Sequence, residues 1–249
     1  PCPGAKNKCE NERQRIYDNH LLLTKSLDSE QGFKDTEIAR LILWAESSSG
    51  FGNDPKKNTE TLKQITTEAQ RLDAAFLIGG DRPSSPGEFE NYGIFIDERG
   101  EISGEYLKQH PVPFGEYIPF RKYLDWIPPL SLVPRDMVRG TQQQVFTTNK
   151  NEIKISPVIS FEGSFDRYIR RSVVQGAEVV VILTNQASYG ESGMSDQFIL
   201  MSRANAISNN RDIAHAAITG KSAFISGIDG DIYSSSGLFT DAVLTDEIK

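Results

Sequence analysis

The chain has 249 residues, of which 38% are hydrophobic and 24% are charged, proportions that allow a substantial buried core. Its formal net charge of −7 argues against a general nucleic-acid-binding protein, because that function requires a basic face. No nucleic acid is therefore expected among its partners. The longest apolar run, Val179–Leu183, is far shorter than the roughly 20 residues that cross a bilayer, and it favours a buried strand.

The few residues that could bind a metal or form a disulfide are dispersed. Cys2 and Cys9 lie in a polar start, where they either pair in an oxidising compartment or remain two free thiols. The three histidines, His20, His110 and His215, match no known metal-site spacing. Neither a metal nor another cofactor is expected.

Helical and strand patterns alternate over the first eighty residues. They predict, in order, a helix over Asn11–Leu27, a buried strand over Leu41–Trp44, a loop over 47–57, a helix through Leu62–Leu72 and a strand over Ala75–Ile78. Asn58 or Thr59 can cap the second helix. Gly79 and Gly80 are expected to end the last strand, because no phosphate-loop pattern surrounds them.

The middle of the chain predicts a hairpin and then a long irregular segment. Tyr92–Ile96 and Ile102–Leu107 flank a plausible turn at 97–100. The segment 111–148 carries six prolines, and loops of that length are usually functional or disordered. Its aromatic residues predict a functional loop that is folded and packed: Phe114, Tyr117, Phe120, Tyr123 and Trp126.

The second half alternates more regularly between the two patterns. Strands are predicted over Ile153–Ser160, Glu178–Thr184, Ile213–Ile218 and Ala223–Ile225, with helices over Asp166–Gln175 and Asp196–Ser208. Such alternation argues for a layered α/β domain.

Reactive side chains stand where predicted strands end. Glu46 follows the first strand, Lys108 ends the hairpin, and Ser160 and Glu162 close the strand that begins near Ile153. An acid, an amine and a hydroxyl at neighbouring strand ends could supply a base, an electrostatic stabiliser and a nucleophile. Each of them, taken alone, is more often a solvated strand end than a reactive group.

Several segments resemble the carbon–nitrogen hydrolase (nitrilase) family, and in particular its apolipoprotein N-acyltransferase members. Leu43–Ser47 is similar to the family's (V/I)WPE(S/T) segment, and Tyr106–Pro119 is close to the acyltransferase pattern Y-x-K-x-x-L-V-P-F-G-E-x-x-P. Ile159–Glu162 resembles I-C-Y-E, and Thr184–Gly190 resembles S-N-D-A-W-F-G. The Tyr106–Pro119 match is the most specific, because other family members usually lack the P-F-G-E extension.

The resemblance implies one domain over residues 1–249, an α/β fold that is a nitrilase-like four-layer α-β-β-α sandwich, with its first strand before Pro1 and outside this chain. The family's general base, oxyanion stabiliser and nucleophile match Glu46, Lys108 and Ser160. Supporting or substrate-binding roles are implied for Glu116, Phe161, Glu162 and Asn185.

For function, the resemblance implies transfer of an acyl chain from a phospholipid, through an acyl-enzyme, to the N-terminal amine of a diacylglyceryl-cysteine lipoprotein. The full protein is then expected in a bacterial cell membrane, held by segments outside this chain, with this domain on the extracytoplasmic face. The abrupt start at Pro1, with neither Met nor a signal-peptide pattern, agrees with a domain of a longer protein. In that setting the aromatic loop is either a packed lid or a flap that faces lipid.

Position 160 departs from the family pattern, because serine stands where the family has cysteine. A serine hydroxyl ionises far less readily than a thiol and commonly needs a histidine base, and no histidine is near Ser160 in the sequence. Ser160 is either an engineered replacement or natural divergence, and further departures at Ala45, Phe161, Gln186 and Ser188 favour divergence. Two alternatives stay open: a catalytically silent homologue that binds a lipoprotein or acyl ligand, and a soluble nitrilase-type amidase.

Overall fold

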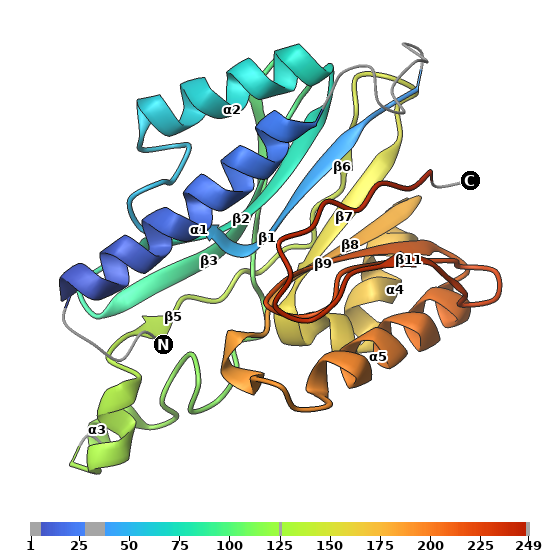
Figure 1. The fold of residues 1–249 in the computed structure, drawn as a ribbon. Helices are drawn as coiled ribbons and strands as arrows, with labels where there is room; N and C mark the ends of the chain where they lie inside the picture. The colour runs from blue at the N-terminus through green and yellow to red at the C-terminus, as the bar shows by residue number, and fades with distance from the viewer. Residues whose placement is uncertain (1–5, 28–37, 125, 248–249) are drawn as a thin grey trace.

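The computed structural model describes residues 6–27, 38–124 and 126–247, which build two β-sheets (Figure 1). The first sheet contains, in spatial order, β1 (Leu41–Ser49), β2 (Ala75–Pro83), β3 (Glu88–Ile96) and β4 (Ile102–Leu107), with β5 (Asp136–Met137) also paired to β3. The β1 and β2 strands are parallel, whereas β2 pairs antiparallel with β3, and β3 pairs antiparallel with β4. The predicted hairpin is therefore confirmed.

The second sheet is built largely by parallel strands with helical crossovers. Its spatial order is β11 (Ile232–Ser235), β10 (Ala223–Ile225), β9 (Asp212–Ile218), β8 (Val179–Asn185), β7 (Lys154–Ile159) and β6 (Phe146–Thr147). The β7, β8 and β9 strands are parallel, which requires crossovers, and these are α4 (Asp166–Val174) and α5 (Met194–Asn209). The alternation predicted for the second half is confirmed.

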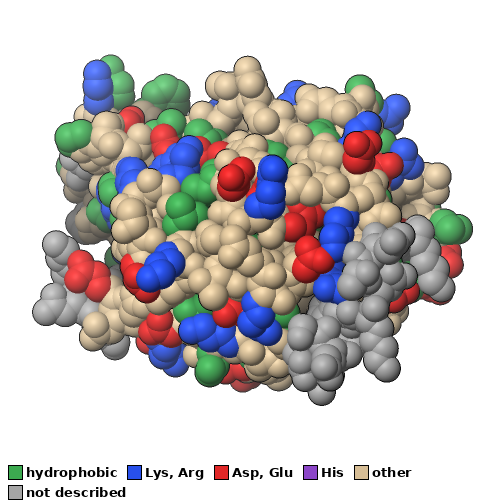
Figure 2. All heavy atoms as spheres, turned by 90° about the horizontal axis from the view of Figure 1, so that it is seen from above, with side chains coloured by type: hydrophobic (Ala, Val, Ile, Leu, Met, Phe, Trp, Pro, Cys, Tyr) green, Lys and Arg blue, Asp and Glu red, His purple; other side chains and the backbone are tan. Residues whose placement is uncertain are grey.

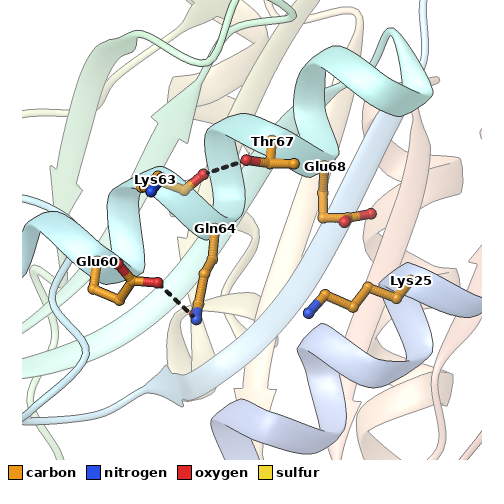
Figure 3. Close-up of a pocket in the computed structure, with 6 residues that line it drawn as sticks. All are labelled: Lys25, Glu60, Lys63, Gln64, Thr67 and Glu68. Carbon is orange, nitrogen blue, oxygen red and sulfur yellow. Dashed lines mark hydrogen bonds between the residues drawn. The ribbon is translucent and has the colours of Figure 1, made fainter.

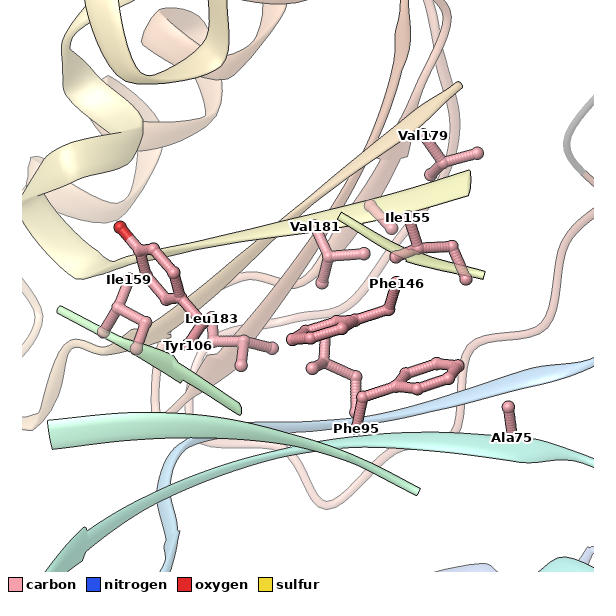
Figure 4. Packing of buried hydrophobic residues seen from close by; sticks show 11 residues of the cluster. Ala75, Phe95, Tyr106, Phe146, Ile155, Ile159, Val179, Val181 and Leu183 are labelled. Carbon is pink, nitrogen blue, oxygen red and sulfur yellow. The ribbon is translucent and has the colours of Figure 1, made fainter. Parts of the chain in front are cut away.

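Helices cover the outer face of each sheet, and the inner faces pack on one another. In β2, Phe76 and Ile78 belong to the cluster with α1 (Lys6–Ser26) and α2 (Thr59–Leu72), because side chains alternate between the faces of a strand. Leu77 instead belongs to the central cluster, which also contains Leu183 of the second sheet. Figure 4 shows this cluster. The α4 and α5 helices pack on the far side of the second sheet. The layer order confirms the four-layer sandwich.

Two strand boundaries predicted from the sequence are wrong. The β1 strand continues past Trp44 with irregular pairing, and β2 runs through Gly79 and Gly80 instead of ending there. A Cβ atom on Gly79 would lie only 2.6 Å from the carbonyl oxygen of Ala45. The glycines therefore let β2 approach the part of β1 that carries Glu46, and they do not break the strand.

The proline-rich segment is folded, but most of its aromatic side chains are exposed. It contains α3 (Arg121–Leu124) and a 3-10 helix, η1 (Pro128–Leu132), in addition to β5 and β6. Ile118 and Val133 are buried. The aromatic residues Phe114, Phe120, Tyr123 and Trp126 are 56% to 79% exposed. The prediction that these aromatics pack is wrong, since the loop is anchored by aliphatic residues instead.

Some expectations lie beyond these observations. Cys2 and the side chain of Cys9 lie outside the described residues, and the strand expected before Pro1 stays a prediction. Among the helices that the structure describes, none is long and apolar enough to cross a membrane. On the face seen in Figure 2, basic and acidic side chains are interspersed and hydrophobic atoms form small groups.

Candidate active site

Three charged side chains meet here: Glu46 of β1, Lys108 directly after β4, and Glu116 of the loop that follows. The Nζ atom of Lys108 lies 3.2 Å from Oε1 of Glu46 and 2.5 Å from Oε1 of Glu116. Lys108 is completely buried and Glu46 is 4% exposed, so little water screens their attraction. The Val112 N–H donates to Oε2 of Glu116 at 2.8 Å, which orients the second carboxylate.

Lys108 remains a cation in this buried position. Burial by itself lowers the pKa of the Lys108 ammonium, but Glu46 and Glu116 raise it by more, so the pKa lies above its usual value. A buried cation between two carboxylates is a preformed positive charge. Such a group can stabilise an oxyanion that develops on a substrate.

Glu162 links the strand end that carries Lys108 to the one that carries Ser160. It is completely buried in a 3-10 helix, η2 (Ser160–Ser164), directly after β7. Its oxygens accept hydrogen bonds at 2.5–2.9 Å from the N–H groups of Gln109, His110 and Ile159 and from the Tyr106 hydroxyl. Burial raises the pKa of Glu162, and these donors offset part of that effect. Glu162 therefore ties the backbone after β4 to the end of β7.

Ser160 occupies a strained turn at the end of β7. Its φ angle is 55°, in the left-handed region that disfavours residues with a Cβ atom. The side chain is half-buried, and its hydroxyl has no hydrogen-bond partner among the described residues. Because Ile159 pairs with Leu183, Ser160 emerges beside the end of β8.

The end of β8 contributes to the site through its backbone. The Asn185 N–H donates to Oε2 of Glu46 at 2.7 Å, whereas the Asn185 side chain accepts from the Ala187 N–H at 3.1 Å. Phe161 is half-buried, and its ring centre lies 5.9 Å from that of His110. The end of β8 is thus hydrogen-bonded to Glu46 through its backbone. The Phe161 ring belongs to the residue that follows Ser160 in the chain.

Two polar residues near this cluster were not anticipated from the sequence. Asn91 of β3 is buried and donates to Oε1 of Glu46 at 2.7 Å. Asp81 of β2 pairs directly with Asn91, so both side chains lie on the same face of the sheet. Burial, with Glu46 and Glu116 adding to it, raises the pKa of Asp81 to about 6. Both residues lie outside the strands predicted from the sequence, so no sequence signal marked them.

The described structure also has a groove on the helices that cover the first sheet. A groove of about 190 Å³ between α1 and α2 is lined by Lys25, Glu60, Lys63, Gln64, Thr67 and Glu68 (Figure 3). Its residues come from helix surfaces, and Glu60 already accepts a hydrogen bond from Gln64. Within residues 6–27, 38–124 and 126–247, no three His, Cys, Asp or Glu side chains are placed to hold a metal ion.

A family model described as carbon–nitrogen hydrolase matches residues 15–249. The chain belongs to the carbon–nitrogen hydrolase family. A relative from Mycolicibacterium smegmatis, named apolipoprotein N-acyltransferase, is 30% identical over 243 residues and covers 96% of this chain. Another of that name, from Geobacter metallireducens, is 30% identical and covers 84%. This carbon–nitrogen hydrolase domain spans 40% of the length of each of these relatives.

Solved structures share the fold of this carbon–nitrogen hydrolase domain. An amidase from Nesterenkonia sp. matches with a TM-score of 0.62 and 19% identity, covering 92% of this chain and 81% of the amidase. A cysteine-to-serine mutant of the Nesterenkonia AN1 amidase, described as from the nitrilase superfamily, gives a TM-score of 0.61 at 19% identity and covers 90% and 80% of the two chains. At this identity the likeness concerns the fold alone, and it confirms the nitrilase-type architecture.

Proposed function

We propose that this domain transfers an acyl chain from a phospholipid to the N-terminal amine of a lipoprotein, through an acyl-enzyme on Ser160. The observation that supports it most is the buried Lys108 between Glu46 and Glu116, in a chain whose relatives are named apolipoprotein N-acyltransferase. The proposal includes a bacterial cell membrane as the location, with this domain on its extracytoplasmic face and the membrane segments outside this chain.

In the first step, Oγ of Ser160 attacks the ester carbonyl carbon of the phospholipid, and Glu46 takes the hydroxyl proton. Lys108 stabilises the tetrahedral oxyanion, an effect of roughly 3 kcal/mol for one well-placed donor. Collapse breaks the ester C–O bond, and the lysophospholipid leaves with the proton from Glu46. In the second step, the lipoprotein amine attacks the acyl ester, so that an amide forms and Ser160 regains its proton.

The exposed aromatic residues support a lipid substrate. Phe120, Tyr123 and Trp126 are 76% to 79% exposed, and they follow Glu116 closely in the chain. Grouped exposed aromatics commonly mark contact with an apolar partner or with the interface of a membrane. In the proposed function, the acyl donor would meet this segment on its way to Ser160.

Intact-protein mass spectrometry after incubation with phospholipid tests the proposal. The protein is compared with its Ser160→Cys and Ser160→Ala variants. We expect one acyl adduct on the unmodified protein and on Ser160→Cys. The Ser160→Cys variant should carry more of it, because a thiol is a few per cent ionised near pH 7. A lipoprotein-type amine should then discharge the adduct. An equal adduct on Ser160→Ala, or no adduct on any form, would contradict the proposal.

A second candidate is a catalytically silent homologue that binds an acyl or lipoprotein ligand. It is favoured by Ser160 itself, because a hydroxyl without a hydrogen-bonded base is a poor nucleophile. In the same experiment, this candidate predicts that phospholipid binds all three forms while none becomes acylated.

A further inference from the structure

Two arginine side chains near the candidate active site have no carboxylate partner. Arg139 and Arg167 are both exposed, and within the described part of the chain neither forms an ion pair. By contrast, Arg82 and Arg121 each form an ion pair with a carboxylate at 2.5–2.6 Å. The two unpaired guanidinium groups are thus available to an external anion.

Neighbouring rings hold these guanidinium groups in place. Arg167 lies over the rings of Phe165 and Tyr168, at 4.6 and 5.0 Å from their centres, and its Nη2 atom is 3.4 Å from Nδ1 of His110. Arg139 lies 5.2 Å above the ring of Tyr117. A stacked guanidinium loses less conformational freedom when it binds a ligand, and its fork of N–H donors matches the oxygens of a phosphate.

His110 connects this basic cluster to the nucleophile position. The backbone N–H of His110 donates to Glu162 at 2.9 Å, and the His110 ring lies against that of Phe161, the neighbour of Ser160. Burial lowers the pKa of His110, and Arg167, Arg139 and Lys108 lower it further, while Glu116 acts in the opposite direction. The three cations thus disfavour the imidazolium form of His110, and a bound anion would favour it.

We propose that Arg139, Arg167 and His110 form a phosphate-binding site beside Ser160, which takes the phosphate group of the phospholipid acyl donor. This inference rests on the proposed function. A phosphodiester carries one negative charge and oxygens that accept paired N–H donors. In a glycerophospholipid the phosphate is separated from the ester carbonyls by only a few bonds, so an anion held here brings an acyl ester to the nucleophile.

A polar pocket offers room for the rest of such a head group. It has a volume of about 450 Å³ and is lined by Gln109, Thr141, Gln142, Gln143, Arg171 and Gln175. Arg171 lies 5.8 Å from the ring centre of Tyr168, the ring that also carries Arg167. The amide and hydroxyl groups that line the pocket suit a hydroxylated head group, which offers both donors and acceptors.

The His110 imidazole provides a direct measure of anion binding, followed by NMR as the pH is changed. Inorganic phosphate, short-chain phosphatidylglycerol below its micelle concentration and the matching diacylglycerol are added in turn. Both phosphate ligands should raise the pKa of His110 by about 0.5–1 unit, because the anion favours the imidazolium. Diacylglycerol should not. His215 is an internal reference, because burial lowers its pKa to about 4. If neither phosphate ligand changes the pKa of His110, the inference is overturned.

Matched variants separate the two arginines from general charge effects. Arg139→Gln and Arg167→Gln together should abolish the phosphate-induced shift, whereas Arg170→Gln should retain it, because Arg170 is exposed on the same helix without contact to the cluster. A shift that survives in the double variant also contradicts the site. A response to inorganic phosphate but not to phosphatidylglycerol would limit the site to free phosphate and contradict its role in donor binding.

A kinetic comparison keeps this inference separable from the proposed function. The double arginine variant should acylate at least about tenfold more slowly from phosphatidylglycerol, since charge-assisted hydrogen bonds are lost, but at an unchanged rate from a p-nitrophenyl acyl ester without phosphate. An equal loss with both donors would make the arginines structural and overturn the inference. Phosphate binding without acylation of any form would instead contradict the proposed function alone.

Discussion

At the scale of single residues, charge is concentrated where solvent is scarce. Lys108 has no exposed surface and contacts Glu46 and Glu116, while Asp81 adds a third acid nearby. Taking charges out of water costs several kcal/mol per ion, and the remaining partners must offset this. Burial raises the pKa of Asp81 to about 6, so Asp81 is expected to take up a proton as the pH falls through 6.

Asp81→Asn is expected to be more stable than the wild type at pH 8, by about 1 kcal/mol. Folded Asp81 keeps its proton up to about pH 6, whereas an unfolded aspartate ionises near pH 4. Stability contributed by the protonated carboxyl is therefore lost as the pH rises through 6. The amide cannot ionise, so the difference should vanish at pH 4; because Asp81 is half-buried, its size is reduced by solvent screening. Urea unfolding at several pH values measures it.

Asp136→Asn is the control of opposite sign. The Arg121 guanidinium holds the pKa of the Asp136 carboxyl below its usual value, so the ionised form stabilises the fold. This variant should be less stable than the wild type at pH 8, and the loss should shrink as the pH falls toward the folded pKa. If both variants respond to pH in the same direction, the assignment of Asp81 is wrong.

At the scale of elements, the contact between β1 and β2 depends on Gly79. A Cβ atom there would lie 2.6 Å from the Ala45 carbonyl oxygen and 2.8 Å from the Cα atom of Glu46. Gly79→Ala is expected to lower the free energy of unfolding by about 2–3 kcal/mol, because backbone atoms must move. Gly93 of β3, which pairs with Gly79, is the control, because a Cβ atom there would meet nothing nearer than 3.6 Å. Equal losses in urea unfolding would refute the close-approach argument.

Phe120, Tyr123 and Trp126, in and beside α3, should insert their side chains into a lipid surface. The chain has two tryptophans, of which Trp126 is 79% exposed and Trp44 is 2% exposed. Adding phosphatidylglycerol vesicles should shift the tryptophan emission to shorter wavelength, because Trp126 would leave water. Trp126→Phe should lose the shift, and Trp44→Phe should keep it. An unchanged wild-type spectrum would count against lipid contact by this segment.

At the scale of the whole molecule, the two sheets share one core and should unfold together. Leu183 lies in the central cluster with residues of both sheets. Leu183→Ala is expected to lower the free energy of unfolding by about 2–5 kcal/mol, through the lost methyl groups and the cavity left behind. Hydrogen exchange should accelerate in β2 as well as in β8. Val174→Ala, at a side chain 79% exposed, should change stability by less than about 0.5 kcal/mol. Acceleration confined to β8 would show that the sheets unfold separately.

The sequence by itself determined the order of the main elements, because hydrophobic spacing records which faces are buried. The helix capped by Asn58, whose side chain accepts from the N–H groups of Glu60 and Thr61, and the buried strand before Asn185 were both recognisable in this way. The family motifs also marked Glu46, Lys108 and Ser160, since local patterns around reactive residues are visible in one chain.

Only the tertiary structure decided which residues meet. Asn91 and Asp81 join the site through strand pairing, and the role of Gly79 depends on a neighbouring backbone that is distant in the chain. Arg167 lies 3.4 Å from Nδ1 of His110 although the two residues are distant in the chain, and the residue after Arg139 pairs with the Lys108 backbone. Contacts between distant residues follow from register and packing, which depend on the whole sheet. The exposure of Trp126 was misjudged for the same reason, because an aromatic residue can be buried or exposed according to what packs against it.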